Sequence, residues 1–101
     1  MYLITETEIA CEDDEMVLKC PQKNLVISVK SAHYGRAEGN DGICYEGICH
    51  ATLDSLSIVK QQCDGMSLCT ISVKNDIFGD PCPNDHNYLE VSFECEAKKG
   101  I

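Results

Sequence analysis

The sequence has little positive charge, no tryptophan and no long apolar run. Lysine and arginine total 8 residues against 17 aspartates and glutamates, which gives the 101-residue chain a net charge of −9. A surface that binds nucleic acid or an anionic membrane requires basic residues, so neither partner is expected. No segment approaches the roughly 18 consecutive apolar residues of a membrane-spanning helix, and we expect no direct membrane insertion.

The chain also lacks the common catalytic motifs. It contains no G-x-S-x-G, no H-E-x-x-H and no glycine-rich phosphate loop. Its three histidines, His33, His50 and His86, could serve as bases, but a lone histidine in a small domain is usually a surface or hydrogen-bonded polar residue. The sequence therefore predicts neither an enzyme nor a bound cofactor.

Cysteine, by contrast, is abundant, because eight cysteines occupy about 8% of the chain, close to the fraction in disulfide scaffolds. An even number in a short chain favours disulfides and an extracellular location, in a secreted protein or in the outer part of a membrane protein. The alternative is a zinc site, but the chain has no C-x-x-C pair of the kind that structural zinc sites usually contain. We expect disulfides and no metal, and the spacing alone leaves the pairing open.

Short alternating runs predict an α+β fold that is mainly β: a small disulfide-stapled antiparallel domain with one short helix and long structured loops. Strands are expected at 16–20, at 25–30 with a continuation toward 35, at 69–73 and at 88–95. The helix is expected at roughly 53–62, with Thr52 or Asp54 as its cap and Asp64-Gly65 after its end. Residues 9–95 form the expected domain, 1–8 an N-terminal extension and 96–101 a linker stub.

The acidic run Glu12-Asp13-Asp14-Glu15 has two interpretations. Calcium sites need six to eight converging oxygens, and four consecutive carboxylates that point in alternating directions do not all face one ion. The other interpretation, a solvated hairpin edge, is the one that the sequence favours, although one of the four carboxylates could still bind another ligand.

Three later motifs resemble those of a known family. They are Ala32-His33-Tyr34-Gly35-Arg36, Phe78-Gly79-Asp80-Pro81-Cys82 and Tyr88-Leu89-Glu90-Val91, and Cys11-Glu12 precedes them. In this order they resemble the galactose/rhamnose-binding lectin domain of sea urchin egg lectins, which also occurs in fish egg lectins and latrophilin-type receptors. The resemblance covers roughly residues 9–95, and all eight cysteines fall in the order of the family.

The resemblance implies a disulfide pairing and a sugar site. The pairs it implies are Cys11–Cys44, Cys20–Cys95, Cys49–Cys82 and Cys63–Cys69. It also implies that sugar hydroxyls are held by two carboxylates and a tyrosine. This chemistry is plausible, since a carboxylate can accept two hydrogen bonds from a vicinal diol. The candidate carbohydrate-binding residues are Glu12, Tyr34, Asn75, Asp80, Asn84 and Asn87.

Each assignment has a structural alternative: Tyr34 and Arg36 could brace the loop, and Asp80 could cap the turn before Pro81. The chain also departs from the family, because Asn84 and Asn87 stand where the family has a glycine and a lysine. A neutral amide thus replaces a charged donor.

The leading hypothesis is an extracellular module that binds a rhamnose- or galactose-like monosaccharide. The lack of tryptophan and the six aromatic residues argue against a broad stacking platform for long glycans. The alternative is a protein-interaction module of an adhesion or guidance receptor, in which the sugar site is altered or lost and the negative charge attracts a basic extracellular partner. A disulfide-rich toxin or inhibitor is a third interpretation.

Overall fold

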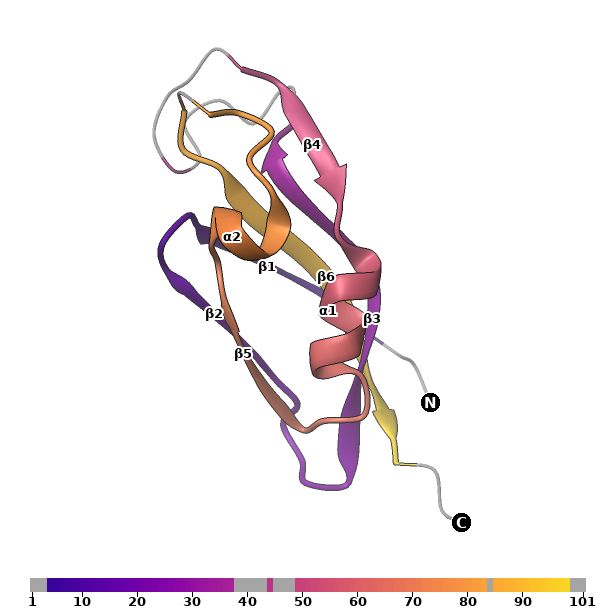
Figure 1. Ribbon diagram of the computed structural model, residues 1–101. Coiled ribbons are helices and arrows are strands. Elements are labelled where there is room, and N and C mark those ends of the chain that lie inside the picture. Colours follow the sequence, from indigo (N-terminus) through magenta and orange to yellow (C-terminus); the bar gives the residue numbers. More distant parts are fainter. Residues whose placement is uncertain (1–3, 38–43, 45–48, 84, 99–101) are drawn as a thin grey trace.

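The computed structural model describes residues 4–37, 44, 49–83 and 85–98 and places them in two layers (Figure 1). Four antiparallel strands form one sheet in the order β1-β6-β3-β4, and β2 pairs with β5 in a second, two-stranded ladder. Two helices complete the described fold. In chain order the elements are β1 (Thr5–Cys11), β2 (Glu15–Lys19), β3 (Leu25–Arg36), β4 (Ala51–Asp54), α1 (Leu56–Cys63), β5 (Leu68–Ser72), α2 (Asn75–Phe78) and β6 (Tyr88–Ala97).

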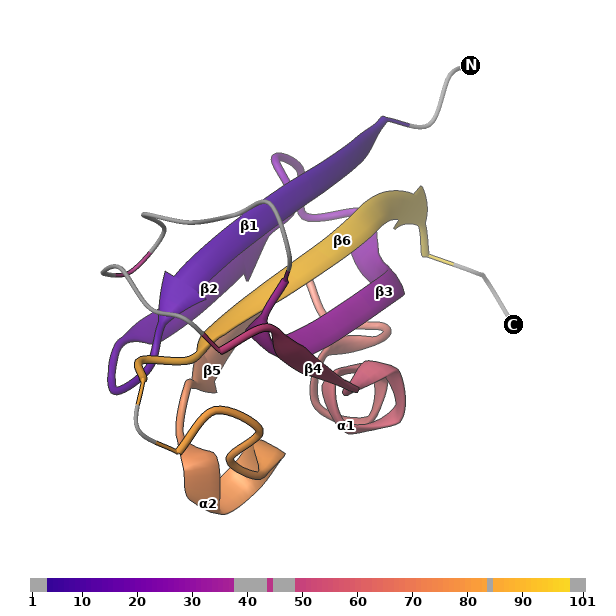
Figure 2. The same cartoon turned by 90° about the horizontal axis from the view of Figure 1, so that it is seen from above.

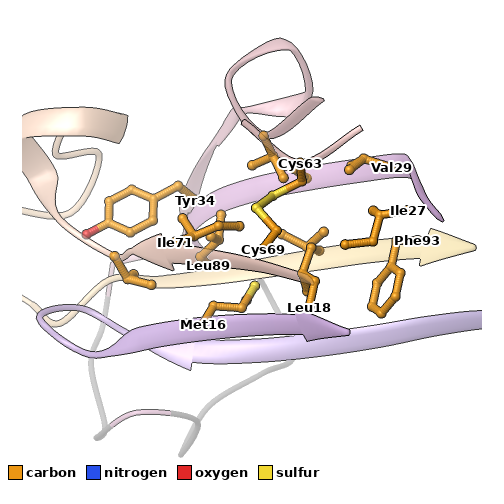
Figure 3. Packing of buried hydrophobic residues seen from close by; sticks show 14 of the residues in the cluster. Met16, Leu18, Ile27, Val29, Tyr34, Cys63, Cys69, Ile71, Leu89 and Phe93 are labelled. Carbon is orange, nitrogen blue, oxygen red and sulfur yellow. A yellow bond between two sulfur atoms is a disulfide. The ribbon is translucent and has the colours of Figure 1, made fainter. Parts of the chain in front are cut away.

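The core lies between the four-stranded sheet and a cover made of the β2–β5 ladder and helix α1 (Figures 2 and 3). Alternation within the strands produces this core, since successive side chains of a strand point to opposite faces. In β6, Leu89, Val91 and Phe93 are buried, while the residues between them are only partly buried. The strand predicted at 88–95 is therefore confirmed, as is the mainly-β class of the domain.

A β-bulge in β3 sets the orientation of the tyrosine on which the candidate site is built. The register between β3 and β6 shifts between Val29 and Ser31. Before the shift Ile27 and Val29 are buried, and after it the buried face passes to Ala32 and Tyr34. A bulge re-aims side chains in this way, and without it Tyr34 would point to the outer, polar face of the sheet.

The helix prediction was partly wrong. Residues Ala51–Asp54 form strand β4, and helix α1 begins only at Leu56, where the Asp54 carboxylate accepts the Leu56 N–H at 3.0 Å. The strand forms because β4 lies against β3 at Gly35, whose φ is +139°. A Cβ there would lie 2.1 Å from the Ala51 carbonyl oxygen, so only glycine permits this close pairing.

Three further segments differ from the expectations. Helix α2 is a single turn between the strands predicted at 69–73 and 88–95, where no helix was predicted, and Gly79 follows its last residue. Residues Thr5–Glu8, expected to belong to an N-terminal extension, pair with β6, and β6 itself continues to Ala97. The run from Glu12 to Glu15 is not the edge of a hairpin, because β1, which precedes it, and β2, which begins at Glu15, pair with different strands.

Four disulfides use all eight cysteines: Cys11–Cys44, Cys20–Cys95, Cys49–Cys82 and Cys63–Cys69. These are the pairs that the resemblance implies, and the cysteines are therefore not zinc ligands. Cys63–Cys69 joins α1 to β5 within the core, whereas Cys49–Cys82 joins the segment before β4 to the loop after α2. Neither helix in the described ranges is long and apolar enough to cross a membrane.

Candidate functional site

Five of the six predicted site residues meet at one end of the molecule. They come from the β1–β2 turn, strand β3, helix α2, the loop after α2 and the residue before β6, and they are Glu12, Tyr34, Asn75, Asp80 and Asn87. The sixth, Asn84, lies outside the described residues. Up to 75 sequence positions separate these residues, and a chain of hydrogen bonds links their side chains.

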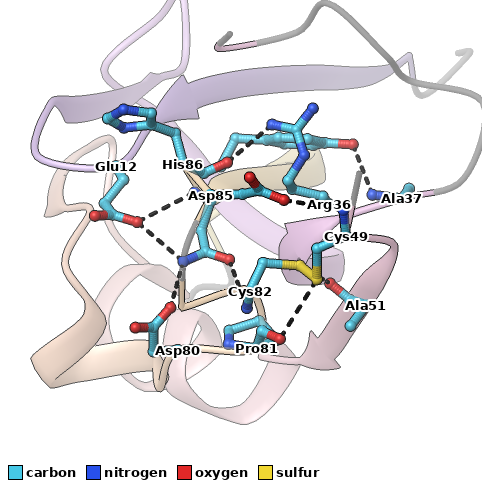
Figure 4. Close-up of a disulfide and its surroundings, with 12 residues drawn as sticks. Glu12, Arg36, Ala37, Cys49, Ala51, Asp80, Pro81, Cys82, Asp85 and His86 are labelled. Carbon is cyan, nitrogen blue, oxygen red and sulfur yellow. Dashed lines mark hydrogen bonds between the residues drawn. A yellow bond between two sulfur atoms is a disulfide. The ribbon is translucent and has the colours of Figure 1, made fainter. Parts of the chain in front are cut away.

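Asn87 lies at the centre of this set and is fully buried. Its side-chain Nδ2 donates to Glu12 Oε1 at 2.9 Å and to Asp80 Oδ1 at 2.8 Å (Figure 4). Asn75 Oδ1 lies 3.3 Å from the same nitrogen. Its Oδ1 accepts the backbone N–H of Cys82 at 3.3 Å. The amide thus holds two carboxylates on either side of one nitrogen and fixes the Cys82 loop against them.

The main chain reinforces the contact between Asn87 and the β1–β2 turn. Glu12 donates its N–H to the Asn87 carbonyl at 2.9 Å, and the N–H of Asn87 donates to Glu12 Oε1 at 3.1 Å. The next residue, Asp13, adopts a left-handed conformation with φ 74° and donates to the Val73 carbonyl at 2.7 Å. The β1–β2 turn is therefore hydrogen-bonded to the residue before β6 and to the residue after β5, and these bonds give Glu12 a defined position.

Tyr34 forms the floor of the site. Its ring is buried and stacks on Phe78, with ring centroids 5.1 Å apart, and its hydroxyl donates to Asn75 Oδ1 at 2.6 Å. Burial raises the pKa of the Tyr34 phenol well above its ordinary value, and the negative charges of Glu12, Asp80 and Asp13 raise this pKa further. The phenol is therefore a neutral hydrogen-bond donor at physiological pH.

The loops around the site are held by buried polar contacts and by a disulfide. Arg36 is buried and donates from NH1 to the His86 carbonyl at 2.9 Å, while Asp85 Oδ2 accepts the N–H of Cys49 at 2.9 Å (Figure 4). The Cys49–Cys82 bridge joins the same two loops. Because each loop is restrained at several points, less entropy is lost when a ligand binds between them.

The side chains of the site residues differ in their exposure to solvent. Asp80 is exposed, and Glu12 and Asn75 are partly buried, so their side chains are available to a ligand. Tyr34 and Asn87 are enclosed by protein. The sequence indicated this set but not the central role of Asn87 or the stacking of Phe78, because both depend on contacts between distant segments.

A shallow depression at the opposite end of β3 and β6 is a less promising site. Its lining includes the first residues of β3, the last residues of β6 and the Asp64-Gly65 turn. The Asp64 carboxylate there is already engaged by Lys60 Nζ at 2.8 Å and by the N–H of Val29, also at 2.8 Å.

Comparison with known proteins identifies the family of the domain. Residues 18–95 match the D-galactoside/L-rhamnose binding SUEL lectin domain, which is more than half of the chain. The chain belongs to this lectin family. It is 38% identical over 97 residues to the L-rhamnose-binding lectin ELEL-1 of Echinometra lucunter, covering 92% of this chain and 93% of that lectin.

Two other relatives show the range of proteins that carry this lectin domain. The D-galactoside-specific lectin of Heliocidaris crassispina is 33% identical over 96 residues, covering 87% of this chain and 88% of that lectin. Human adhesion G protein-coupled receptor L1 is 36% identical over 98 residues, covering 91% of this chain but only 6% of the receptor. The lectin domain therefore occurs in small lectins and as a small part of a large receptor.

Proposed function

We propose that this lectin domain binds a galactose- or rhamnose-like monosaccharide at the site formed by Glu12, Asn75 and Asp80 above Tyr34. The observation that carries the proposal is the pair of carboxylates fixed on the two sides of Asn87 Nδ2, at 2.9 and 2.8 Å. Each carboxylate keeps a second oxygen that can accept hydrogen bonds from neighbouring sugar hydroxyls. Two similar relatives are named for binding L-rhamnose and D-galactosides.

In this proposal the buried residues position the sugar-binding groups. Asn87 orients Glu12 and Asp80, and Tyr34 orients the Asn75 amide through its hydroxyl. Because these groups are already ordered in the free protein, little conformational entropy is lost when the sugar binds. The role is binding, not catalysis, and it suits an extracellular lectin whose affinity for one sugar is weak and whose avidity comes from several copies.

Isothermal titration of the oxidised domain with D-galactose and L-rhamnose tests this proposal. We expect saturable binding of at least one sugar, and at least tenfold weaker binding for Glu12→Gln and for Asp80→Asn, since hydrogen bonds to charged groups contribute about 1.5–3 kcal/mol. Glu6→Gln, an exposed β1 substitution, is the control and should bind as the wild type does. Equal affinities in all four proteins would place the sugar elsewhere.

A second function, recognition of a protein by a receptor ectodomain, is favoured by the 36% identity to adhesion G protein-coupled receptor L1. The net charge of −9 would attract a basic partner. If neither sugar binds at tens of millimolar while the domain is folded, this becomes the leading function.

A further inference from the structure

The described site uses its side-chain hydrogen-bond donors internally. The Tyr34 hydroxyl donates to Asn75 Oδ1, and both hydrogens of Asn87 Nδ2 are taken up by the acceptors around it. The Tyr34 hydroxyl and the Asn87 side-chain amide therefore have no hydrogen available to donate to a ligand. Of the described site side chains, only the Nδ2 group of Asn75 remains as a donor without a protein acceptor.

The groups left for a ligand are mainly acceptors. Glu12 uses Oε1 and Asp80 uses Oδ1 to hold Asn87, and the second oxygen of each carboxylate has no partner among the described residues. Asp80 is exposed and Glu12 is partly buried, so both oxygens can be reached. The site is thus complementary to a ligand that donates hydrogen bonds.

Glu12 and Asp80 form no ion pair with a lysine of the described ranges. In the described part of the chain, the side chains of Lys30 and Lys60 form ion pairs with carboxylates outside the site, and Lys74, which precedes α2, forms no ion pair with Glu12 or Asp80. The guanidinium of Arg36 is buried and donates to the His86 carbonyl. Asp13, exposed in the adjacent turn, adds a third carboxylate whose charge acts on Tyr34.

We propose that this site prefers a cationic amino sugar to the corresponding neutral sugar, and the neutral sugar to a uronate. The inference rests on the proposed function, because it specifies the class of sugar that the same site binds. An ammonium group donates three hydrogen bonds and accepts none, which matches two free carboxylate oxygens. A uronate carboxylate is a pure acceptor and is repelled by Glu12 and Asp80.

The charge of the sugar matters more than the position of its amine. At 0.1 M salt the Debye length is about 10 Å, which exceeds the width of a monosaccharide. An amine on any ring carbon of a bound sugar therefore lies within the field of the two carboxylates. The preference should weaken as salt is added, because screening reduces interactions between partly exposed charges.

Titration of the oxidised domain at pH 6 with four sugars tests the inference: D-galactosamine, D-galactose, N-acetyl-D-galactosamine and D-galacturonate. N-acetylation keeps the nitrogen but removes its charge, so it separates charge from shape. We expect galactosamine to bind about three- to tenfold more tightly than galactose, and galacturonate at least about threefold more weakly. In 0.5 M NaCl these differences should largely disappear.

Variants assign the preference to the site. Asp80→Asn and Glu12→Gln should each reduce the ratio of galactosamine to galactose affinity toward one, whereas Glu6→Gln, on the exposed strand β1, should leave the ratio unchanged. If galactose binds and galactosamine binds no more tightly, the inference is wrong while the proposed function stands. If none of the four sugars binds, the inference fails, and if L-rhamnose does not bind either, the proposed function fails with it. Binding of galactosamine in all three variants as in the wild type would also overturn the inference.

Discussion

Replacing Asn87 by aspartate is the sharpest perturbation of the site, because it changes one NH₂ group to oxygen and leaves the shape almost intact. The buried amide donates to Glu12 Oε1 at 2.9 Å and to Asp80 Oδ1 at 2.8 Å. Asn87→Asp removes both donors and places a third carboxyl between two existing carboxylates. We expect the variant to be less stable than the wild type, by an amount that depends on pH.

The size of the loss can be bounded. If the introduced carboxyl ionises, three negative charges meet in a partly buried site. If it stays protonated at pH 7, the cost of holding a group of ordinary pKa about 3.9 neutral is about 4 kcal/mol, since each pH unit corresponds to about 1.4 kcal/mol. The introduced carboxyl adopts whichever protonation state costs less free energy, so the electrostatic penalty is at most about 4 kcal/mol at pH 7. At pH 5 the same limit falls to about 1.5 kcal/mol.

The sign of the pH dependence follows from linkage. Burial and the two neighbouring carboxylates raise the pKa of the introduced carboxyl in the folded protein above its unfolded value. The folded variant then binds more protons than the unfolded chain between these two pKa values, so it gains stability relative to the wild type as the pH falls from 7 to 5. We expect a loss of about 2–4 kcal/mol at pH 7 that shrinks by at least about 1 kcal/mol at pH 5.

Guanidinium unfolding of the oxidised proteins, followed by circular dichroism at pH 7 and pH 5, measures this difference. Asn24→Asp, a substitution of the same chemistry at an exposed position, is the control and should change stability by less than about 0.5 kcal/mol at either pH. The interpretation of Asn87 is refuted if its aspartate variant loses no more stability than this control, or if its loss is the same at both pH values.

Three other changes test the surrounding structure. Tyr34→Phe removes the 2.6 Å hydrogen bond to Asn75 but keeps the ring, so we expect the free energy of unfolding in urea to fall by about 1 kcal/mol. Because the pKa of Tyr34 is raised in the folded protein, the stability of the wild type should also fall as the pH rises above about 10, and that of the variant should fall less steeply. Gly35→Ala places a Cβ 2.1 Å from the Ala51 carbonyl oxygen and should lower the free energy of unfolding by more than about 3 kcal/mol. The control is Gly65→Ala, where the added Cβ meets open space and the loss should be about 1 kcal/mol. Equal decreases of the melting temperature in the two variants would contradict the close approach of β4 to β3. Joint replacement of Cys49 and Cys82 by serine should cost about 2–5 kcal/mol and weaken sugar binding, and unchanged binding would show that this bridge does not organise the site.

The sequence predicted those parts of the fold that depend on local patterns. Alternation in β2, β5 and β6 sets which side chains are buried, and a short-range pattern of this kind is visible without knowing the neighbouring strands. Strand β1 was missed because its Thr-Glu-Thr-Glu start has no apolar face and obtains its order from pairing with β6. Helix α2 is a single turn, too short to show a helical period.

The candidate site could be predicted only in part for the same reason. Cys11-Glu12 and the Asp80 motif indicated which residues belong together, but the exposure of each depends on contacts between distant segments. Asn87 is enclosed because the β1–β2 turn folds over it, and strand β4 replaces the first part of the expected helix because Gly35 has no Cβ. Neither contact leaves a periodic signal in the sequence.

The most direct test of the sugar site is a two-dimensional amide NMR titration of the oxidised ¹⁵N-labelled domain with D-galactose and L-rhamnose. We predict saturable shifts for the backbone amides of Glu12, Asp80 and Asn87 and for the Asn75 side-chain NH₂. The amides of Ser28 and Gly65, at the opposite end of β3, should not move. Shifts confined to that opposite end, or none at tens of millimolar of either sugar, would contradict the account.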